Sequence, residues 1–185
     1  MILFINACVR GDSRTKKLAD YLLSKTSEPI DELRLEDIEF PAVDESFLNN
    51  RDRLISKREF DNPMFYLARQ FAQADKIIIA APYWDLSFPA SLKQYFEQIN
   101  VNGVTFTYSD EGFPVGLCKA EKLYYITTAG GHYVPKEFGY GYVKALSDSF
   151  YGIEEVELIK AVGLDIAGAD EEKIIQECIN KTKPI

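Results

Sequence analysis

Residues 77–96 read IIIAAPYWDLSFPASLKQYF, and this stretch decides the fold. The unbroken apolar run from Ile77 to Ala81 is the pattern of a strand that is covered on both faces, as central parallel strands are. Pro82 ends the run and Pro89 is placed to begin a helix, so residues 83–88 form a loop at the carboxyl end of the strand. Ligands of open parallel sheets bind at that edge.

The loop carries two large aromatic residues, Tyr83 and Trp84, beside Asp85. A loop that presents flat rings rather than burying them in a core indicates a flat, aromatic ligand. The alternative is that the two rings only fill the gap between the strand and the helix.

Length and composition favour one domain over residues 1–185, with a core large enough to need no metal or disulfide. A net charge of −8 disfavours a nucleic-acid surface, although acidic electron carriers share it. No apolar run has the length of a membrane span, and the first residues lack the pattern of a signal peptide, so we expect a cytoplasmic protein.

Three cysteines, Cys8, Cys118 and Cys178, stand at wide spacings without a C-x-x-C pair. An odd number at such spacings is typical of reduced thiols and predicts neither disulfides nor a metal site. Cys8 lies on a candidate ligand loop, where a small buried filler is the simpler interpretation and a reactive thiol the alternative.

A first buried strand over Ile2–Ala7 leads directly into a loop and then a helix. Free amides at the helix start, two hydroxyls and two guanidinium groups together predict a phosphate site, with the residues Arg10, Ser13, Arg14 and Thr15. The alternative is an ordinary N-cap with two solvated arginines. The segment contains neither a P-loop nor G-x-G-x-x-G, which disfavours nucleoside triphosphate hydrolysis and a Rossmann NAD site.

Strand, loop and helix alternate five times, which predicts an α/β protein with a doubly wound parallel sheet and helices on both faces. The other strands are expected at Pro29–Leu35, Leu123–Thr128 and Val156–Val162, and the other helices at Met64–Ala74, Ala90–Ile99, Phe138–Phe150 and Glu171–Ile179. Two segments fit this scheme less simply. We expect Phe40–Asn62 to be a partly helical excursion over the carboxyl edge of the sheet and Gly103–Gly112 to be a long loop with no core role.

The fourth strand ends in the turn Thr127–Tyr133, which contains Gly130, Gly131 and the only histidine, His132. Paired glycines let backbone amides approach a ligand closely. His132 is a candidate site residue, with a structural role as the equal alternative. Three loops thus converge at one rim, the first suited to a phosphate and the others to a planar heterocycle, a division that flavin mononucleotide (FMN) fits.

Four motifs in order resemble the flavodoxin-like NAD(P)H-dependent oxidoreductase family of FMN-dependent azoreductases and quinone reductases. Residues 81–93, APYWDLSFPASLK, resemble its A-P-M-Y-N-F-x-I-P-x-x-L-K loop, and residues 103–108, GVTFTY, resemble its G-x-T-F-x-Y. Residues 127–131, TTAGG, resemble T-T-x-G-G, and residues 156–164 resemble the strand that ends in R-A-x-G-L. The resemblance implies a five-stranded flavodoxin-like sheet of order 2-1-3-4-5.

By this resemblance, FMN would lie against three sets of residues. The ring would contact Pro82, Tyr83, Trp84, Asp85 and Leu86, its pyrimidine edge Thr128, Ala129, Gly130, Gly131 and His132, and the phosphate Arg10, Ser13, Arg14 and Thr15. His132 and Tyr108 are the candidate catalytic residues that would orient or protonate the acceptor, with Tyr133 as another possibility. The arginines at positions 10 and 14 and Ala129 depart from the azoreductase pattern, which bears on azo-dye activity and leaves FMN in place.

The implied activity is ping-pong transfer of two electrons from NAD(P)H to a small-molecule acceptor, a quinone, an azo compound or a similar molecule. The family forms homodimers with the flavin at the interface, and aromatic residues that could contribute here are Phe106, Tyr108, Tyr140 and Phe150. Three alternatives remain, namely a flavodoxin-type electron carrier, a flavin reductase that supplies a partner protein, and a flavin-free protein whose loops bind other proteins.

Overall fold

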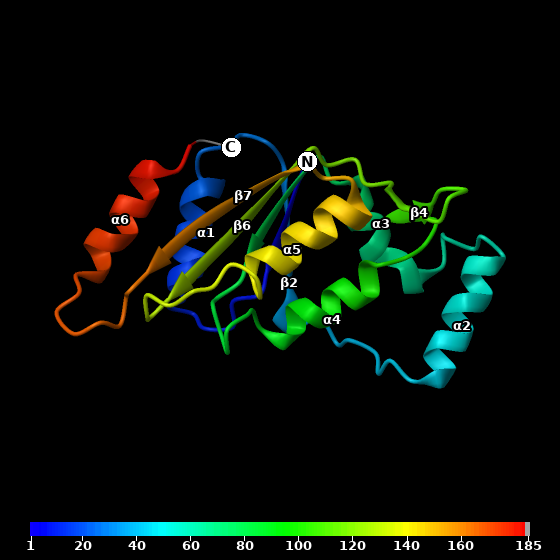
Figure 1. Cartoon of the computed structure of the whole chain (residues 1–185), viewed down its shortest axis with the longest axis horizontal. Helices are drawn as coiled ribbons and strands as arrows, with labels where there is room; N and C mark the ends of the chain where they lie inside the picture. The colour runs from blue at the N-terminus through cyan, green and yellow to red at the C-terminus, as the bar shows by residue number, and fades with distance from the viewer. Residues whose placement is uncertain (184–185) are drawn as a thin grey trace.

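A computed structural model describes residues 1–183, and its centre is a five-stranded parallel sheet (Figure 1). The strands are β1 (Ile2–Asn6), β2 (Ile30–Arg34), β3 (Lys76–Ala80), β6 (Lys122–Ala129) and β7 (Glu155–Val162). They lie in the order β2-β1-β3-β6-β7. Counted along the chain, these five strands have the predicted order 2-1-3-4-5, so the doubly wound flavodoxin-like sheet is confirmed.

Burial along the strands follows their position in the sheet. Every residue of β1 is buried, and so are Ile77 to Ala80 of β3, because helices cover both faces at the centre. The edge strand β2 instead alternates between exposed and partly buried residues. The apolar runs of the sequence therefore report the two-sided burial of the central strands.

Helices cover both faces of the sheet, as predicted. On one face lie α1 (Arg14–Leu23) and α6 (Glu171–Lys181), which share a hydrophobic cluster with Phe4 and Ile78, with α6 next to β7. On the other face lie α3 (Tyr66–Gln73), α4 (Ala90–Ile99) and α5 (Tyr140–Leu146), over Ile5 and Ile79. A π-helical turn, Ser147–Tyr151, continues α5, and short 3₁₀ turns occupy Leu35–Asp37 and Pro63–Phe65. Within the described residues, every helix is too short or too polar to cross a membrane.

The segment Gly103–Gly112 corrects one expectation, because part of it belongs to the core. It contains β4 (Phe106–Tyr108), which pairs antiparallel with β5 (Pro114–Gly116) in a separate two-stranded sheet. Thr105 is fully buried, and its hydroxyl donates to the carbonyl of Ile99 at 2.7 Å. The ring of Phe106 is also buried, against Phe150, with the ring centroids 4.6 Å apart.

The segment Phe40–Asn62 corrects a second expectation. It is partly helical, as α2 (Glu45–Ser56), but α2 does not cover the carboxyl edge of the sheet. Arg51 of α2 donates to the carbonyls of Glu97 and Asn100, at the C-terminal end of α4. The helix α4 starts just after the loop at the carboxyl end of β3 and runs back along the sheet. Its C-terminal end, where Arg51 binds, therefore lies toward the edge formed by the amino ends of the strands. Figure 1 accordingly shows α2 away from the arrowheads of β6 and β7.

Candidate functional site

The loop between β1 and α1 supplies hydrogen-bond donors at a helix start. Ser13 is the N-cap of α1, and its hydroxyl accepts from the amide of Lys16 at 3.3 Å. Thr15 follows in the first turn, and its hydroxyl lies 2.7 Å from the hydroxyl of Thr128 in the interior. This contact joins the loop after β1 to the end of β6. The two strands are not neighbours, because β3 lies between them in the sheet.

The loop after β3 is anchored at both ends of a tight turn. The amide of Tyr83 donates to the carbonyl of Thr128 at 3.1 Å, and Trp84 and Ser87 exchange two backbone hydrogen bonds of 3.1 and 2.7 Å. Asp85 and Leu86 at the tip have φ angles of 49° and 68°. Left-handed backbone is uncommon for a leucine, which makes this turn a strained feature of the kind found at functional sites.

The turn after β6 packs against the end of β7. The carbonyl of Gly130 accepts from the amide of Asp165 at 3.0 Å, and the carbonyl of Gly131 accepts from the amide of Gly163 at 3.1 Å. Gly130 lies so close to the Asp165 carboxylate that a Cβ at position 130 would overlap it. The ring of His132 lies over Gly163 in the same way, leaving no room there for a side chain.

These loops enclose a cleft of about 410 Å³ at the carboxyl edge of the sheet. It brings together most of the predicted cofactor-binding residues, namely Arg10, Ser13, Arg14, Thr15, Pro82, Tyr83, Trp84, Thr128 and Gly130. Its remaining lining residues were not predicted, namely Val9, Asp12, Lys17, Asp165 and Glu171. Asp165 directly follows the last motif, Gly163-Leu164, just after β7. A charged residue in the loop at the carboxyl end of a strand was the sequence feature that could have identified it as a site residue.

The side chain of Arg14 pairs with two carboxylates in the cleft lining. Its guanidinium lies 2.7 Å from the carboxylate of Asp165 and 3.3 Å from that of Glu171. The hydrogen bond with Asp165 raises the pKa of Arg14, and the same contact lowers the pKa of Asp165. The cations of the cleft without an ion pair among the described residues are therefore Arg10 and Lys17.

The other predicted residues lie outside the cleft lining. Ala129 is buried within β6, Asp85 and Leu86 are at the exposed tip of their turn, and Gly131 and His132 are exposed beyond Gly130.

Tyr108 is at the other end of the molecule. It lies on β4, in the hairpin that packs on the turn Ser147–Tyr151, just before the amino end of β7. His132 instead follows the carboxyl end of β6, so this placement rules out Tyr108 as part of its own chain's cleft. Of the four aromatic residues expected at a dimer contact, only Tyr108 is largely exposed, at 52%. The Tyr140 hydroxyl donates to the carbonyl of Val156 at 3.0 Å.

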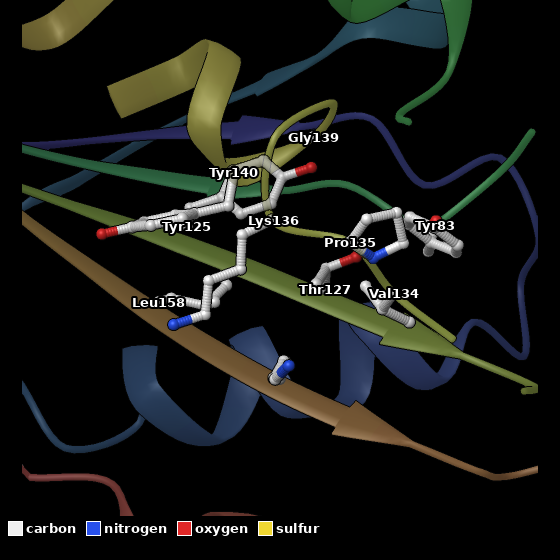
Figure 2. Close-up of a pocket in the computed structure, with 10 residues that line it drawn as sticks. Tyr83, Tyr125, Thr127, Val134, Pro135, Lys136, Gly139, Tyr140 and Leu158 are labelled. Atoms are coloured by element: carbon white, nitrogen blue, oxygen red, sulfur yellow. The ribbon is translucent and has the colours of Figure 1, made fainter. Parts of the chain in front are cut away.

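The side chain of Tyr83 borders two spaces. Tyr83 lines both the cleft and a second, smaller cavity, which is covered by residues 134–139. Figure 2 shows the ring beside Val134 and Pro135. The hydroxyl is shielded from solvent and has no partner among the described residues. This desolvation raises the pKa of Tyr83.

Cys8 agrees with the filler interpretation. It is buried, with its sulfur 3.7 Å from the carbonyl of Ala80. Burial raises the pKa of the Cys8 thiol, which disfavours the reactive thiolate.

The cleft has the chemistry for a ligand with one anionic end and one flat end. A volume of this size is within the range of small-molecule and cofactor sites. The helix start, Ser13, Arg10 and Lys17 suit the anionic end, and Trp84 and the backbone near Gly130 suit the flat end.

Comparisons with known proteins agree with this geometry. A model of the Flavodoxin_2 family, described as having a flavodoxin-like fold, matches residues 1–183. A protein of Clostridium perfringens named FMN-dependent NADH:quinone oxidoreductase is 37% identical, over 97% of this chain and 94% of its own. One of the same name from Clostridium beijerinckii is also 37% identical, over 98% and 96%. The crystal structure of an azoreductase from Bacillus anthracis strain Sterne superposes with a TM-score of 0.85, at 26% identity over 97% of this chain and 95% of that one.

Proposed function

The chain belongs to the Flavodoxin_2 family, and from this membership and the cleft we propose that it is an FMN-dependent NAD(P)H oxidoreductase. Its acceptor is a quinone, an azo compound or a similar small molecule. The observation that carries the proposal is that one cleft is lined both by the start of α1, with Ser13 and Thr15, and by the aromatic turn at Tyr83 and Trp84. Relatives at 37% identity with the name FMN-dependent NADH:quinone oxidoreductase support it.

FMN fits the residues of the cleft. The phosphate would meet the first amides of α1, the hydroxyls of Ser13 and Thr15, and the cations Arg10 and Lys17. Arg14 would act indirectly, by neutralising Asp165 and Glu171, whose charges would otherwise repel the phosphate. The ring would lie between Trp84 and Gly130.

Bound FMN would supply two-electron redox chemistry, taking hydride from NAD(P)H and reducing the acceptor after the nicotinamide has left. The protein's part is to bind and orient. The side chain of Trp84, 37% exposed at the cleft, offers a flat surface to the ring system. At Gly130 the absence of a side chain lets the backbone approach the ligand. His132, exposed beyond the turn, is kept as the candidate group that orients or protonates the acceptor.

The assembly we propose is a homodimer in the cytoplasm. Exposed apolar side chains gather on the β4–β5 hairpin and the residue after it, namely Tyr108, Phe113, Val115 and Leu117. Such a surface suits a contact with a second copy, and a partner is the route by which Tyr108 could reach a cleft. All three cysteines are free thiols, which suits a reducing compartment.

The test begins with the absorbance spectrum of the purified protein after incubation with FMN and gel filtration. A flavin spectrum, together with steady oxidation of NADH or NADPH when a quinone is added, is the expected result. Flavin binding without turnover would identify an electron carrier instead, and turnover that requires free FMN would identify a flavin reductase. Absence of flavin binding would contradict the proposal as a whole. Sedimentation of the same sample measures the dimer.

A further inference from the structure

The second cavity lies behind the cleft, on the other side of Tyr83. Residues of the segment 134–139 lie there over the middle of β6 and β7 and leave a partly open space of about 10 Å³, enough for one water molecule. Its walls include the rings of Tyr83 and Tyr125 and the side chains of Thr127 and Leu158 (Figure 2). The cavity is thus a partly open recess of one-water size with polar groups in its wall.

Two of these polar groups lack a hydrogen-bond partner. The hydroxyls of Tyr83 and Thr127 are both shielded from solvent, and neither has the distance and angle of a hydrogen bond to another described residue, although Thr127 lies close enough to the Tyr125 hydroxyl to lower its pKa. Thr127 is only 3% exposed. A buried hydroxyl without a partner costs about 1–3 kcal/mol, so native proteins pair such groups with protein atoms or with buried water.

We propose that one ordered water molecule occupies this cavity, bridges the hydroxyls of Tyr83 and Thr127, and makes Tyr83 a positioning residue for the cleft wall. Both hydroxyls belong to side chains that line the same cavity. Water in a protein interior needs two to four polar partners, and these two hydroxyls supply the minimum. Water is the ligand that a space of about 10 Å³ admits.

The position of Thr127 next to Thr128 gives the water its structural consequence. Neighbouring residues of a strand point to opposite faces of the sheet, so Thr128 meets Thr15 at the cleft while Thr127 faces the cavity. The carbonyl of Thr128 already accepts from the amide of Tyr83. The backbone amide of Tyr83 is thus already joined to β6, and the water would join its side-chain hydroxyl to β6 as well. Tyr83 would then be held at both its backbone and its side chain.

Removal of the Tyr83 hydroxyl tests the proposal. A hydroxyl that binds a water stabilises the protein, whereas a buried hydroxyl without any partner destabilises it, so the sign of the change in unfolding free energy distinguishes the two. Tyr83→Phe should lower the equilibrium constant of folding about fivefold, because the water and Thr127 lose a partner. Tyr95→Phe is the matched control, since the Tyr95 hydroxyl is also buried without a partner, but it lies in the aromatic core against Phe71 and Phe96. Removing that hydroxyl should leave the stability unchanged or raise it. Urea unfolding measures both, and stabilisation by Tyr83→Phe equal to that by Tyr95→Phe would overturn the proposal.

A double-mutant cycle and a crystal structure complete the test. If one water joins the hydroxyls, Thr127→Val should cost less stability in the Tyr83→Phe background than in the natural chain, whereas additive effects would show that the two groups act independently. A crystal structure of the natural chain that resolves ordered waters should show one within hydrogen-bond distance of both oxygens. An empty cavity there would overturn the proposal even if Tyr83→Phe fails to fold.

The positioning role rests on the proposed function, and FMN affinity tests it separately. Tyr83→Phe should weaken FMN binding several-fold, whereas Tyr95→Phe should leave it unchanged. Equal FMN affinity of Tyr83→Phe and the natural chain would overturn the positioning role. If the natural chain binds no FMN, the proposed function fails, while the unfolding and crystallographic results still decide whether the water is present.

Discussion

Arg14 and Asp165 are 151 residues apart in the sequence, yet the guanidinium Nη1 lies 2.7 Å from the carboxylate Oδ1 at the mouth of the cleft. The pair places a carboxylate where the proposed phosphate would approach. Asp165→Asn should therefore tighten FMN binding, by at most about fivefold because the pair is exposed to solvent. Fluorescence titration at low and high salt measures the effect, which salt should reduce.

Glu172→Gln is the matched control for this substitution. Glu172 lies in the first turn of α6 beside Glu171 and is exposed, outside the cleft lining. An equal gain in affinity for both variants would show that the overall negative charge, and not the position of Asp165, limits FMN binding.

Arg10 should distinguish the phosphate end of the cleft from the ring end. Arg10 is exposed in the cleft lining, and a charge-assisted hydrogen bond to phosphate there should contribute about tenfold in affinity. Arg10→Ala should thus weaken FMN binding and leave riboflavin, which lacks the phosphate, unaffected. A comparable loss for both flavins would place Arg10 away from the phosphate and would contradict the proposed orientation.

The sheet and its loops could be predicted because their signals are local. Two-sided burial forces long apolar runs such as Ile77 to Ala81, and proline or glycine marks the loops that follow. The β4 strand escaped prediction because its three residues are too few to show a strand period, and its partner, β5, is equally short.

The parts of the site that escaped prediction depend on contacts distant in sequence. The pairing of Arg14 with Asp165 depends on how the end of β7 packs beside α1, which local sequence does not determine. The direction of the Tyr83 side chain depends on residues 134–139, some fifty positions later. Tyr108 was expected at the site from the resemblance to a family motif, and such a resemblance does not show at which edge of the sheet a residue lies.

Arg51 should matter more for stability than its neighbour Arg53. Arg51 is partly buried and donates to two backbone carbonyls at the C-terminal end of α4, where a cation also favours the helix dipole. Burial lowers the pKa of Arg51. Arg51→Ala should destabilise the protein by about 2 kcal/mol in urea unfolding, the value typical of a hydrogen bond to a charged group.

Arg53→Ala is the control on the same helix. Arg53 bonds to Asn50 and lies 3.6 Å from Glu59, both at the exposed surface, and such pairs contribute about 0–1 kcal/mol. Neither variant should change FMN binding, because α2 lies away from the cleft. Equal destabilisation by the two variants would show that Arg51 does not anchor α2 to α4.

Asp75 should give the protein a pH-dependent stability in acid. Hydrogen bonds from Lys119 and the N-terminal ammonium lower the pKa of Asp75 from 3.8 to about 2. A lowered carboxyl pKa contributes stability above pH 3.8, and that contribution is lost as the pH falls toward 2.

Unfolding midpoints between pH 6 and pH 2 test the Asp75 prediction. Asp75→Asn should be less stable than the natural chain at pH 6, and the difference should shrink steadily as the pH falls from about 4 toward 2. Asp61→Asn is the control, because Asp61 is exposed and forms no ion pair within the described part of the chain. A difference between natural chain and Asp75→Asn that stays constant with pH would contradict the assignment.

Gly130 should tolerate a side chain less well than Gly131. A Cβ at position 130 would overlap the carboxylate of Asp165, whereas a Cβ at position 131 would have no atom within 4 Å. Gly130→Ala should therefore displace Asp165 from Arg14. It should lower the free energy of unfolding by about 1 kcal/mol, the lower end of the cost of overpacking. Gly131→Ala should leave the stability unchanged. Asp165→Ala should restore tolerance of Gly130→Ala, because it removes the atoms of closest approach. Thermal unfolding of the four variants measures this rescue, and a full cost of Gly130→Ala in the Asp165→Ala background would show that the backbone, not the carboxylate, excludes a side chain at position 130.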